Sequence, residues 1–244
     1  MKTGLRIEDL GFRASTKPPG GSAFPQIQNP KSQILNPGLL ILAIALCLPF
    51  SGASAGAQVY APLSASVRAV LQRSVADQAS PRLAFATQYE ADVWLKEMSR
   101  RLQKRIPDIE SRLDFLSTVH YEATRAGLEP ELVLGLIEVE SGFKKYAVSS
   151  VGARGYMQVM PFWVKEIGTA EHNLFHLRTN LRYGCTILRY YLDIEKGDLY
   201  RALGRYNGSL GSPEYPAMVR AAWHNNWASP RRTVSNDTLP ANRS

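Results

Sequence analysis

Apolar residues recur with a period near 3.6 through nearly every segment after residue 57. This spacing lines up apolar side chains on one face of an α-helix. It predicts helices over residues 88–106, 107–126, 130–141, 161–167, 178–194, 198–206 and 214–223. The two-residue alternation of a half-buried strand is absent, apart from at most a small ribbon in the glycine-containing segment 142–160. The sequence therefore predicts a mainly α fold.

The same period predicts which side chains face the core. In the helix over 88–106 they are Ala91, Trp94, Leu95, Met98, Leu102 and Ile106. In the helix over 107–126 they are Ile109, Leu113, Leu116, Val119 and Ala123. Cys185 has apolar neighbours at helical spacing, so we expect it in the core as well.

One long apolar run, residues 38–50, precedes this helical part. It is too short for a comfortable membrane span, and Pro49 interrupts it. Basic residues lie upstream and small residues follow, which is typical of a secretory signal cut near Ala55 or Ala57. Leu46 stands where a small residue normally precedes a lipidated cysteine, so lipidation at Cys47 is disfavoured. We expect an exported, periplasmic protein whose mature form has no stable membrane span.

The net charge bears on the classes of molecule that the protein could bind. The 244 residues carry a net charge of +8, with 29 basic and 21 acidic side chains. Residues 1–57 hold five of the basic and two of the acidic ones, so the mature chain carries +5. A nucleic-acid binder is one interpretation, suggested by Arg100, Arg101, Lys104 and Arg105. A solvated basic helix face on an exported protein explains them better.

These patterns predict four parts. Residues 1–57 form a signal peptide with a long basic flank, and 58–106 a helical extension. Residues 107–228 form a second helical part, and 229–244 a flexible polar tail.

The helix over 130–141 places a carboxylate among apolar side chains. Glu140 follows Val133, Leu136 and Ile137 at i+7, i+4 and i+3, so it shares their face, whereas Glu138 lies on a polar face with Glu131 and Gly135. Burial and the negative end of the helix dipole both raise a carboxyl pKa. A carboxyl held partly neutral is suited to general acid catalysis. The alternative is a glutamate whose head reaches solvent at a helix end.

The residues around Glu140 form an ordered set of motifs. Glu140-Ser141 is followed by the segment from Ser149 through Gly152-Ala153-Arg154-Gly155-Tyr156-Met157-Gln158-Val159-Met160-Pro161. Asn180-Leu181-Arg182-Tyr183-Gly184 and Arg205-Tyr206-Asn207-Gly208 come later. Over roughly residues 110–225 this resembles the soluble lytic transglycosylase family, which implies that residues 107–228 form a goose-type lysozyme-like catalytic domain.

The resemblance implies an activity on the glycan strands of peptidoglycan. Glu140, as the single general acid and base, would cleave the β-1,4 bond between N-acetylmuramic acid and N-acetylglucosamine. The muramic C6 hydroxyl would attack the anomeric carbon and leave a 1,6-anhydro end. No cofactor is implied.

The resemblance also implies roles for other residues. Ser149, Gln158 and Tyr206 would hydrogen-bond to sugar or to Glu140, with Asn207 beside them. Met157 and Met160 would shape an apolar wall, and Ser141, Gly152 and Gly155 would belong to the structural loop. Core packing is the alternative interpretation for the two methionines and for Tyr206.

Two other functions stay open. The first is a lysozyme-type hydrolase that uses the same glutamate, and the second is a non-catalytic glycan-binding protein of an envelope machine. His172 and His176 have the i, i+4 spacing of a metal pair. The sequence offers neither the usual glutamate nor a third ligand for zinc, so no metal is expected.

Overall fold

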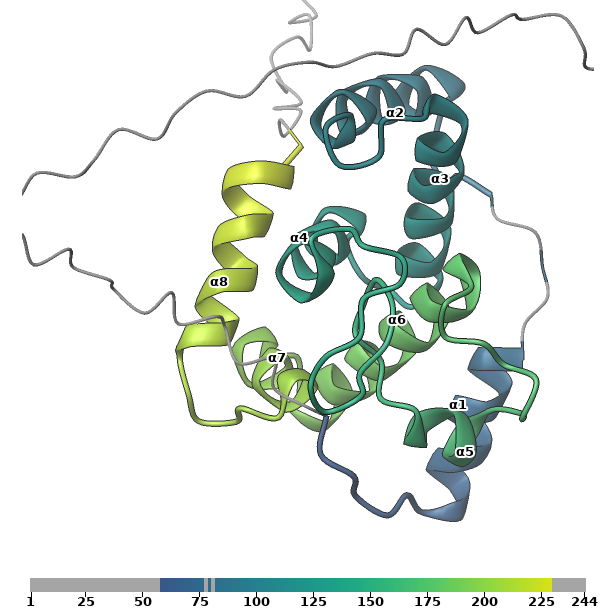
Figure 1. The fold of residues 1–244 in the computed structure, drawn as a ribbon, viewed down its shortest axis with the longest axis vertical. Coiled ribbons are helices and arrows are strands. Elements are labelled where there is room, and N and C mark those ends of the chain that lie inside the picture. Colours follow the sequence, from purple (N-terminus) through teal and green to yellow (C-terminus); the bar gives the residue numbers. More distant parts are fainter. Residues whose placement is uncertain (1–57, 77–78, 80–81, 230–244) are drawn as a thin grey trace, which may run out of the picture. The chain divides into compact units, whose positions relative to one another are not determined.

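The computed structural model describes residues 58–76, 79 and 82–229. The predicted signal over 1–57 and nearly all of the predicted tail lie outside these residues. The described helices are α1 (Ala65–Ala76), α2 (Gln88–Leu102), α3 (Ile109–Arg125), α4 (Pro130–Ser141), α5 (Phe162–Ile167), α6 (Leu177–Ile194), α7 (Leu199–Asn207) and α8 (Glu214–Ala222), followed by a π-helical turn η1 (Trp223–Trp227) (Figure 1). The prediction of a mainly α fold is confirmed.

Local sequence sets the helix ends. The Thr87 hydroxyl accepts a hydrogen bond from the Glu90 amide at 3.2 Å, and Asp108 accepts one from the Ser111 amide at 2.7 Å. Such side-chain caps satisfy amides that the first turn leaves unpaired. At the other end of α4, Gly142 closes the helix with a left-handed φ of 56°. Helix α2 stops at Leu102, four residues before the predicted end.

The predicted inward face of α3 is partly wrong. Leu116, Val119 and Ala123 are fully buried, but Ile109 is 60% exposed and Leu113 is 38% exposed. The face of α3 that is buried differs from the predicted one. It also contains Arg112 and Glu122, which a pattern of apolar residues leaves out.

Glu122 is the acidic centre of a buried cluster of ion pairs. Its carboxylate is fully buried and pairs with Arg182 at 2.8 Å and with Arg125 at 3.0 Å. Arg182 comes from α6, so the cluster ties α3 to α6. A buried carboxylate needs such partners because its desolvation is otherwise very costly.

Helix α4 lies at the centre of the helical bundle. It packs against α3, α8 and η1 (Figure 1). Its residues 132–137 are all buried. At Gly135 an added Cβ atom would lie 2.7 Å from the backbone nitrogen of Trp223, so only glycine permits the close approach of η1.

The predicted polar face of α4 is only partly exposed to solvent. Glu131 accepts hydrogen bonds from the Trp94 indole at 2.8 Å and from the Ser229 hydroxyl at 2.6 Å. Glu138 accepts one from the Trp227 indole at 2.7 Å. Glu131 therefore joins α4 to α2 and to the end of the described chain, and Glu138 joins α4 to η1.

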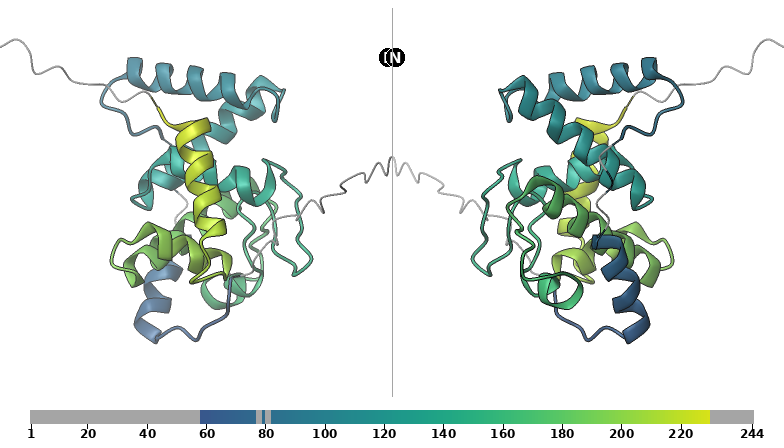
Figure 2. Two further views of the ribbon diagram at one scale, coloured as in Figure 1. Left: turned by 90° about the vertical axis from the view of Figure 1, so that its left-hand side faces the viewer. Right: turned by 90° about the vertical axis from the view of Figure 1, so that its right-hand side faces the viewer.

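Helices α1 and α2 lie at opposite ends of the described bundle (Figure 2). Helix α1 packs on α5 and α6, and α2 packs mainly on α3. Arg68 of α1 also pairs with Glu166 of α5 at 3.0 Å. Within the described part of the chain, none of the helices combines the length and the apolar character needed to cross a membrane.

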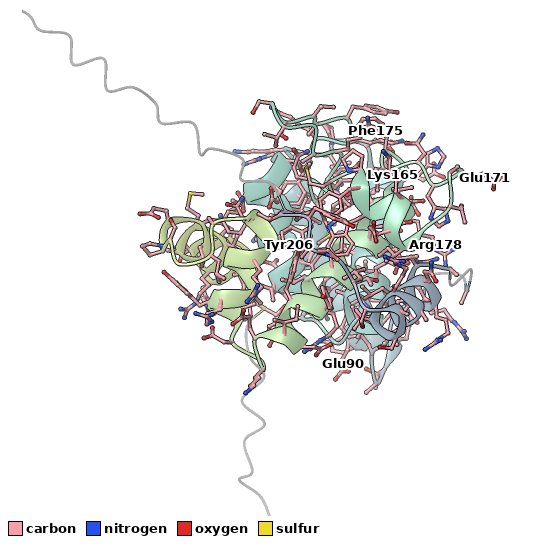
Figure 3. All side chains as sticks on the ribbon, turned by 90° about the horizontal axis from the view of Figure 1, so that it is seen from below. Glu90, Lys165, Glu171, Phe175, Arg178 and Tyr206 are labelled. Atoms are coloured by element: carbon pink, nitrogen blue, oxygen red, sulfur yellow. The ribbon has the colours of Figure 1, made fainter. Side chains whose placement is uncertain are left out.

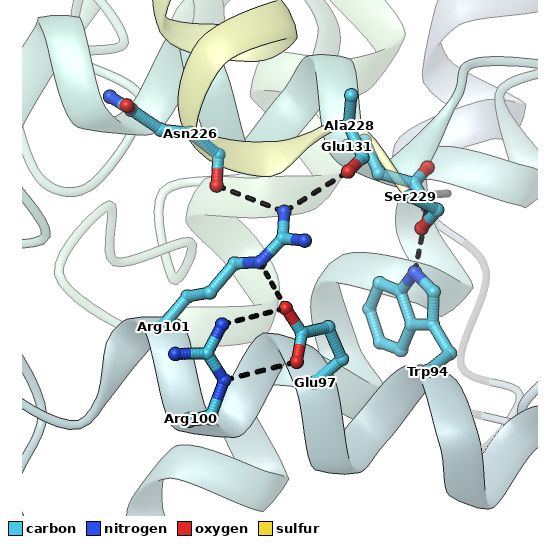
Figure 4. A network of polar contacts seen from close by, with 8 residues as sticks. All are labelled: Trp94, Glu97, Arg100, Arg101, Glu131, Asn226, Ala228 and Ser229. Atoms are coloured by element: carbon cyan, nitrogen blue, oxygen red, sulfur yellow. Dashed lines mark hydrogen bonds and ion pairs between the residues drawn. The ribbon is translucent and has the colours of Figure 1, made fainter. Parts of the chain in front are cut away.

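The basic face of α2 has local partners. Glu97 pairs with Arg100 at 2.9 Å and with Arg101 at 2.7 Å (Figure 4). Arg101 also donates to the carbonyl oxygens of Asn226 and Ala228, at 3.0 and 3.1 Å. These contacts fasten the end of the described chain to α2, which gives part of the basic run a structural role.

Candidate active site

Glu140 lies in the last turn of α4 and is only part-buried, although Val133, Leu136 and Ile137 beneath it are fully buried. Burial raises the pKa of Glu140 to about 8, and a hydrogen bond from Tyr215 opposes this rise. The carboxyl is therefore mostly protonated at neutral pH. A glutamic acid in this state can donate a proton to a leaving oxygen.

Tyr215 is the polar partner of Glu140. It lies in the first turn of α8, is 6% exposed, and its hydroxyl donates to Glu140 Oε1 at 2.5 Å. The sequence does not single it out, because a tyrosine near a helix start is ordinarily a packing residue. Only the contact between α4 and α8 shows its position.

Replacing Tyr215 by phenylalanine should raise the pKa of Glu140 further. The hydroxyl stabilises the carboxylate, so its removal disfavours ionisation, by about one pKa unit for a hydrogen bond to a charged group. Carboxyl-carbon NMR titration of native protein and Tyr215→Phe measures the change. Tyr89→Phe, at an exposed tyrosine, is the control. An unchanged or lowered pKa in Tyr215→Phe would contradict this geometry.

The segment after Glu140 is held by backbone and side-chain hydrogen bonds. Two isolated β-bridges pair Arg154 with Val148 and with Val159, which confirms the small ribbon. Asn180 of α6 is fully buried, and its Oδ1 accepts from the Met157 amide at 2.8 Å. Its Nδ2 donates to the carbonyl oxygens of Arg154 and Leu174, both at 2.8 Å. One side chain thus fixes three backbone groups.

Gly155 makes the contact with Asn180 possible. Its φ is +74°, and an added Cβ would lie 2.4 Å from Asn180 Nδ2. Both facts require glycine at this position. Gly152 also has a positive φ, but the space beside it is open.

Gln158 and Ser149 stabilise the same loop. The Gln158 side chain is buried and donates to the carbonyl oxygens of Gly155 at 2.9 Å and Ala147 at 3.2 Å. The Ser149 hydroxyl accepts from the Ala153 amide at 3.1 Å and is part-exposed. The bonds of Gln158 are therefore internal, whereas Ser149 keeps a hydroxyl hydrogen available for a ligand.

Tyr206 of α7 is fully buried and lies amid the packed side chains, whereas Glu171 and Arg178 lie toward one edge (Figure 3). Its hydroxyl donates to the Met157 carbonyl at 2.7 Å, not to Glu140. Burial, and then the nearby Glu140 carboxylate, raise the pKa of Tyr206 well above its usual value. Tyr206 therefore remains a hydrogen-bond donor.

The remaining predicted site residues surround this arrangement. Met157 is fully buried against Gly184, where an added Cβ would lie 2.3 Å from the Met157 sulfur. Met160 is part-buried, and Asn207 is buried at the end of α7. Ser141 belongs to α4 rather than to the loop, because its hydroxyl bonds the Ile137 carbonyl at 3.2 Å within the last helical turn.

The two histidines have different local settings. His176 is the N-cap residue of α6, whereas His172 Nδ1 lies 2.7 Å from the Tyr183 hydroxyl. Over residues 58–76, 79 and 82–229, no group of three His, Cys, Asp or Glu side chains could hold a metal ion.

Comparison with known proteins shows what the segment around this site is similar to. Residues 117–215 match the family model of the transglycosylase SLT domain. A transglycosylase of Enterobacteria phage PRD1 is 31% identical over 109 residues, which are 45% of this chain and 40% of the phage protein. The membrane-bound lytic murein transglycosylase C of Actinobacillus pleuropneumoniae is 53% identical over 47 residues, 19% of this chain and 13% of that protein.

A third relative aligns over a longer stretch. The membrane-bound lytic murein transglycosylase C of Haemophilus ducreyi is 35% identical over 112 residues, 39% of this chain and 30% of that protein. The chain thus spans less than half the length of each of these relatives. The matched region holds Glu140, Asn180, Tyr206 and Tyr215 together with the loop between α4 and α5. Residues 117–215 are therefore similar to the transglycosylase SLT domain, and they lie in the mainly helical part of the chain that the structure describes.

Proposed function

We propose that this protein is a peptidoglycan lytic transglycosylase with Glu140 as its single catalytic acid and base. The observation that carries the proposal is a carboxyl with a pKa of about 8, positioned by Tyr215 inside a segment similar to the transglycosylase SLT domain. Relatives that carry lytic murein transglycosylase in their names support the same substrate.

The first step is protonation of the glycosidic oxygen. Glu140 donates its proton to the oxygen that joins N-acetylmuramic acid to the next N-acetylglucosamine, and the bond to the anomeric carbon breaks. Because its pKa is raised to about 8, Glu140 still holds this proton at neutral pH. The sugar left behind has oxocarbenium-like character.

The second step returns the proton. Glu140, now ionised, takes the hydrogen of the muramic C6 hydroxyl, and that oxygen bonds to the anomeric carbon. The product is a 1,6-anhydro end, water is neither consumed nor released, and Glu140 is again protonated.

A single carboxylate suits this chemistry. Glycosidases that admit water ordinarily need a second carboxylate to activate it or to form a covalent intermediate. The segment 142–160 that follows Glu140 contains neither Asp nor Glu. An intramolecular hydroxyl removes the need for that second group, and the acetamido group of the substrate is our candidate to stabilise the charge.

The proposed location is the periplasm. The support is the basic flank, apolar run and small residues of 1–57, together with relatives whose names place them at a membrane. A mature charge of +5 would favour weak, salt-sensitive attraction to anionic envelope polymers. Further partners in an envelope machine belong to the same proposal.

Fragment analysis tests the proposal. Purified peptidoglycan is digested with native protein, and the released fragments are identified by mass spectrometry. We expect muramic acid ends lighter by one water than reducing ends. Reducing ends throughout would indicate a lysozyme-type hydrolase instead. Absence of any fragments would indicate a glycan-binding protein without catalytic activity.

A further inference from the structure

Gln58, at the start of the described chain, reaches the loop that carries Met157 and Met160. Its Oε1 accepts a hydrogen bond from the Met160 amide at 3.0 Å. Its Nε2 lies 3.3 Å from the Gln158 carbonyl and donates to it. Gln58 is 4% exposed, although more than a hundred residues separate it from Met160 along the chain. The side-chain amide thus pairs with the loop as a neighbouring strand would, because it bonds the carbonyl of one residue and the amide two residues later.

The two bonds from Gln58 complete the pairing of the loop backbone. Residues 157–160 have four amides and four carbonyls. Asn180 and Tyr206 take the amide and carbonyl of Met157. The Gly155 carbonyl takes the Gln158 amide, and Arg154 takes both groups of Val159. The Met160 carbonyl accepts from the Trp163 amide, which leaves the Gln158 carbonyl and the Met160 amide to Gln58. All eight backbone groups are therefore paired, as burial demands.

The loop has a conformation that needs such support. Gln158 has a φ of +47°, a left-handed conformation that non-glycine residues rarely adopt. Such positions persist only where surrounding contacts over-determine them. Its side chain is fixed by Ala147 and Gly155, and its carbonyl is fixed by Gln58.

The segment around Gln58 has further anchors. Tyr60 packs edge-on against Phe162, with ring centroids 5.5 Å apart, just beyond the loop. Arg68 pairs with Glu166 on the same helix, α5. Both contacts join the segment that begins at Gln58 to α5, the helix that follows the loop.

We infer that Gln58 is a positioning residue of the active site, which holds the Met157–Met160 loop in its working conformation. The matched SLT domain begins at residue 117, so this assignment extends the functional unit to a segment before it. Gln58 would act on catalysis through Tyr206, because the Tyr206 hydroxyl binds the loop carbonyl at Met157 and lies close enough to Gln58 and to Glu140 for both to influence its pKa. The inference rests on the proposed function only where catalytic activity is measured.

The test compares three variants of the full chain. Gln58→Ala removes both bonds. Gln58→Glu keeps an acceptor for the Met160 amide, but its carboxylate repels the Gln158 carbonyl and can bond it only when protonated. Gln72→Ala makes the same chemical change as the first variant at an exposed position of α1. Amide hydrogen exchange is read at Met160 and, as an internal reference, at Val119 in the core of α3.

In Gln58→Ala we expect faster exchange at Met160 and unchanged exchange at Val119. We expect kcat to fall by roughly 10- to 100-fold with little change in KM, since displacements near 1 Å of active-site groups have effects of that size. Relative to native protein, Gln58→Glu should recover activity as the pH falls and its carboxyl becomes protonated. A loss caused only by unfolding would not recover in this way.

Two results would overturn the inference. One is Met160 exchange and kcat in Gln58→Ala equal to those of Gln72→Ala. The other is a Gln58→Glu profile parallel to the native one at every pH. Exchange at Met160 is measured without substrate, so it tests the contact even if native protein releases no anhydro fragments. That last result would refute the proposed function alone.

Discussion

Glu140→Gln is expected to lower the rate of peptidoglycan cleavage by roughly 10²- to 10⁴-fold, the usual contribution of a positioned general acid. Glutamine can still accept the hydrogen bond from Tyr215, so the packing between α4 and α8 is retained. It cannot donate a proton to the leaving oxygen or take one from the C6 hydroxyl. The rate of fragment release from purified peptidoglycan measures the loss.

Glu138→Gln is the matched control for this variant. It makes the same change two residues earlier on α4, where the carboxylate accepts hydrogen bonds from Trp227 and Asn226. An amide oxygen can accept these bonds as well, so we expect activity within about threefold of native. Native activity in Glu140→Gln, or equal losses in both variants, would show that Glu140 has no catalytic role.

Glu140→Gln should also change stability with a defined dependence on pH. The pKa of Glu140 rises from 4.5 in the unfolded chain to about 8 in the folded protein. Between these values the folded state holds a proton that the unfolded state has lost, so this group lowers stability as pH rises. The variant removes that effect. It should match native stability near pH 4 and exceed it by a few kcal/mol at pH 8. Denaturation at the two pH values measures the difference.

Asn180→Ala is expected to destabilise the protein by about 3 kcal/mol or more, because each unpaired buried polar group costs roughly 1–3 kcal/mol. The substitution leaves the Met157 amide and the carbonyls of Arg154 and Leu174 without their partner. Peptidoglycan cleavage should fall as well, because the loop that bonds Tyr206 loses its fixed position. Urea denaturation and the cleavage rate measure the two effects.

Asn173→Ala is the control for this prediction. Asn173 is exposed, seven residues earlier, and its side chain accepts a single hydrogen bond from the Phe175 amide at 2.9 Å. We expect its free energy of unfolding to change by less than about 1 kcal/mol. If Asn180→Ala were no more destabilising than Asn173→Ala, the three bonds of Asn180 would not hold the loop as described.

The sequence predicts the helices well because helix formation is encoded locally. The caps at Thr87 and Asp108 and the glycine at 142 set boundaries close to those expected, and the apolar period locates the helices between them. Ile109 and Leu113 are assigned wrongly because the buried face of α3 includes charged residues. An apolar pattern cannot distinguish a buried ion cluster around Glu122 from a solvated face.

The site was predictable where motifs are contiguous. Glu140 stood out through its place on an apolar helical face. Tyr215 and Gln58 did not, because each reaches the site from a distant segment and carries no local signal. The hydrogen bonds of Tyr206 and Gln158 could not be predicted from the sequence for a related reason. Sequence places both near the site but cannot say that their partners are backbone groups of the loop.

The central claim is that Glu140 directs a cleavage in which no water enters the product. Native protein is used to digest purified peptidoglycan in water enriched with heavy oxygen, and the muramic acid ends are examined by mass spectrometry. The account predicts anhydro ends without the heavy isotope, because the new bond is made by the C6 oxygen of the sugar itself. Reducing muramic acid ends that carry the heavy isotope would show that water attacks the anomeric carbon. That result would contradict the account.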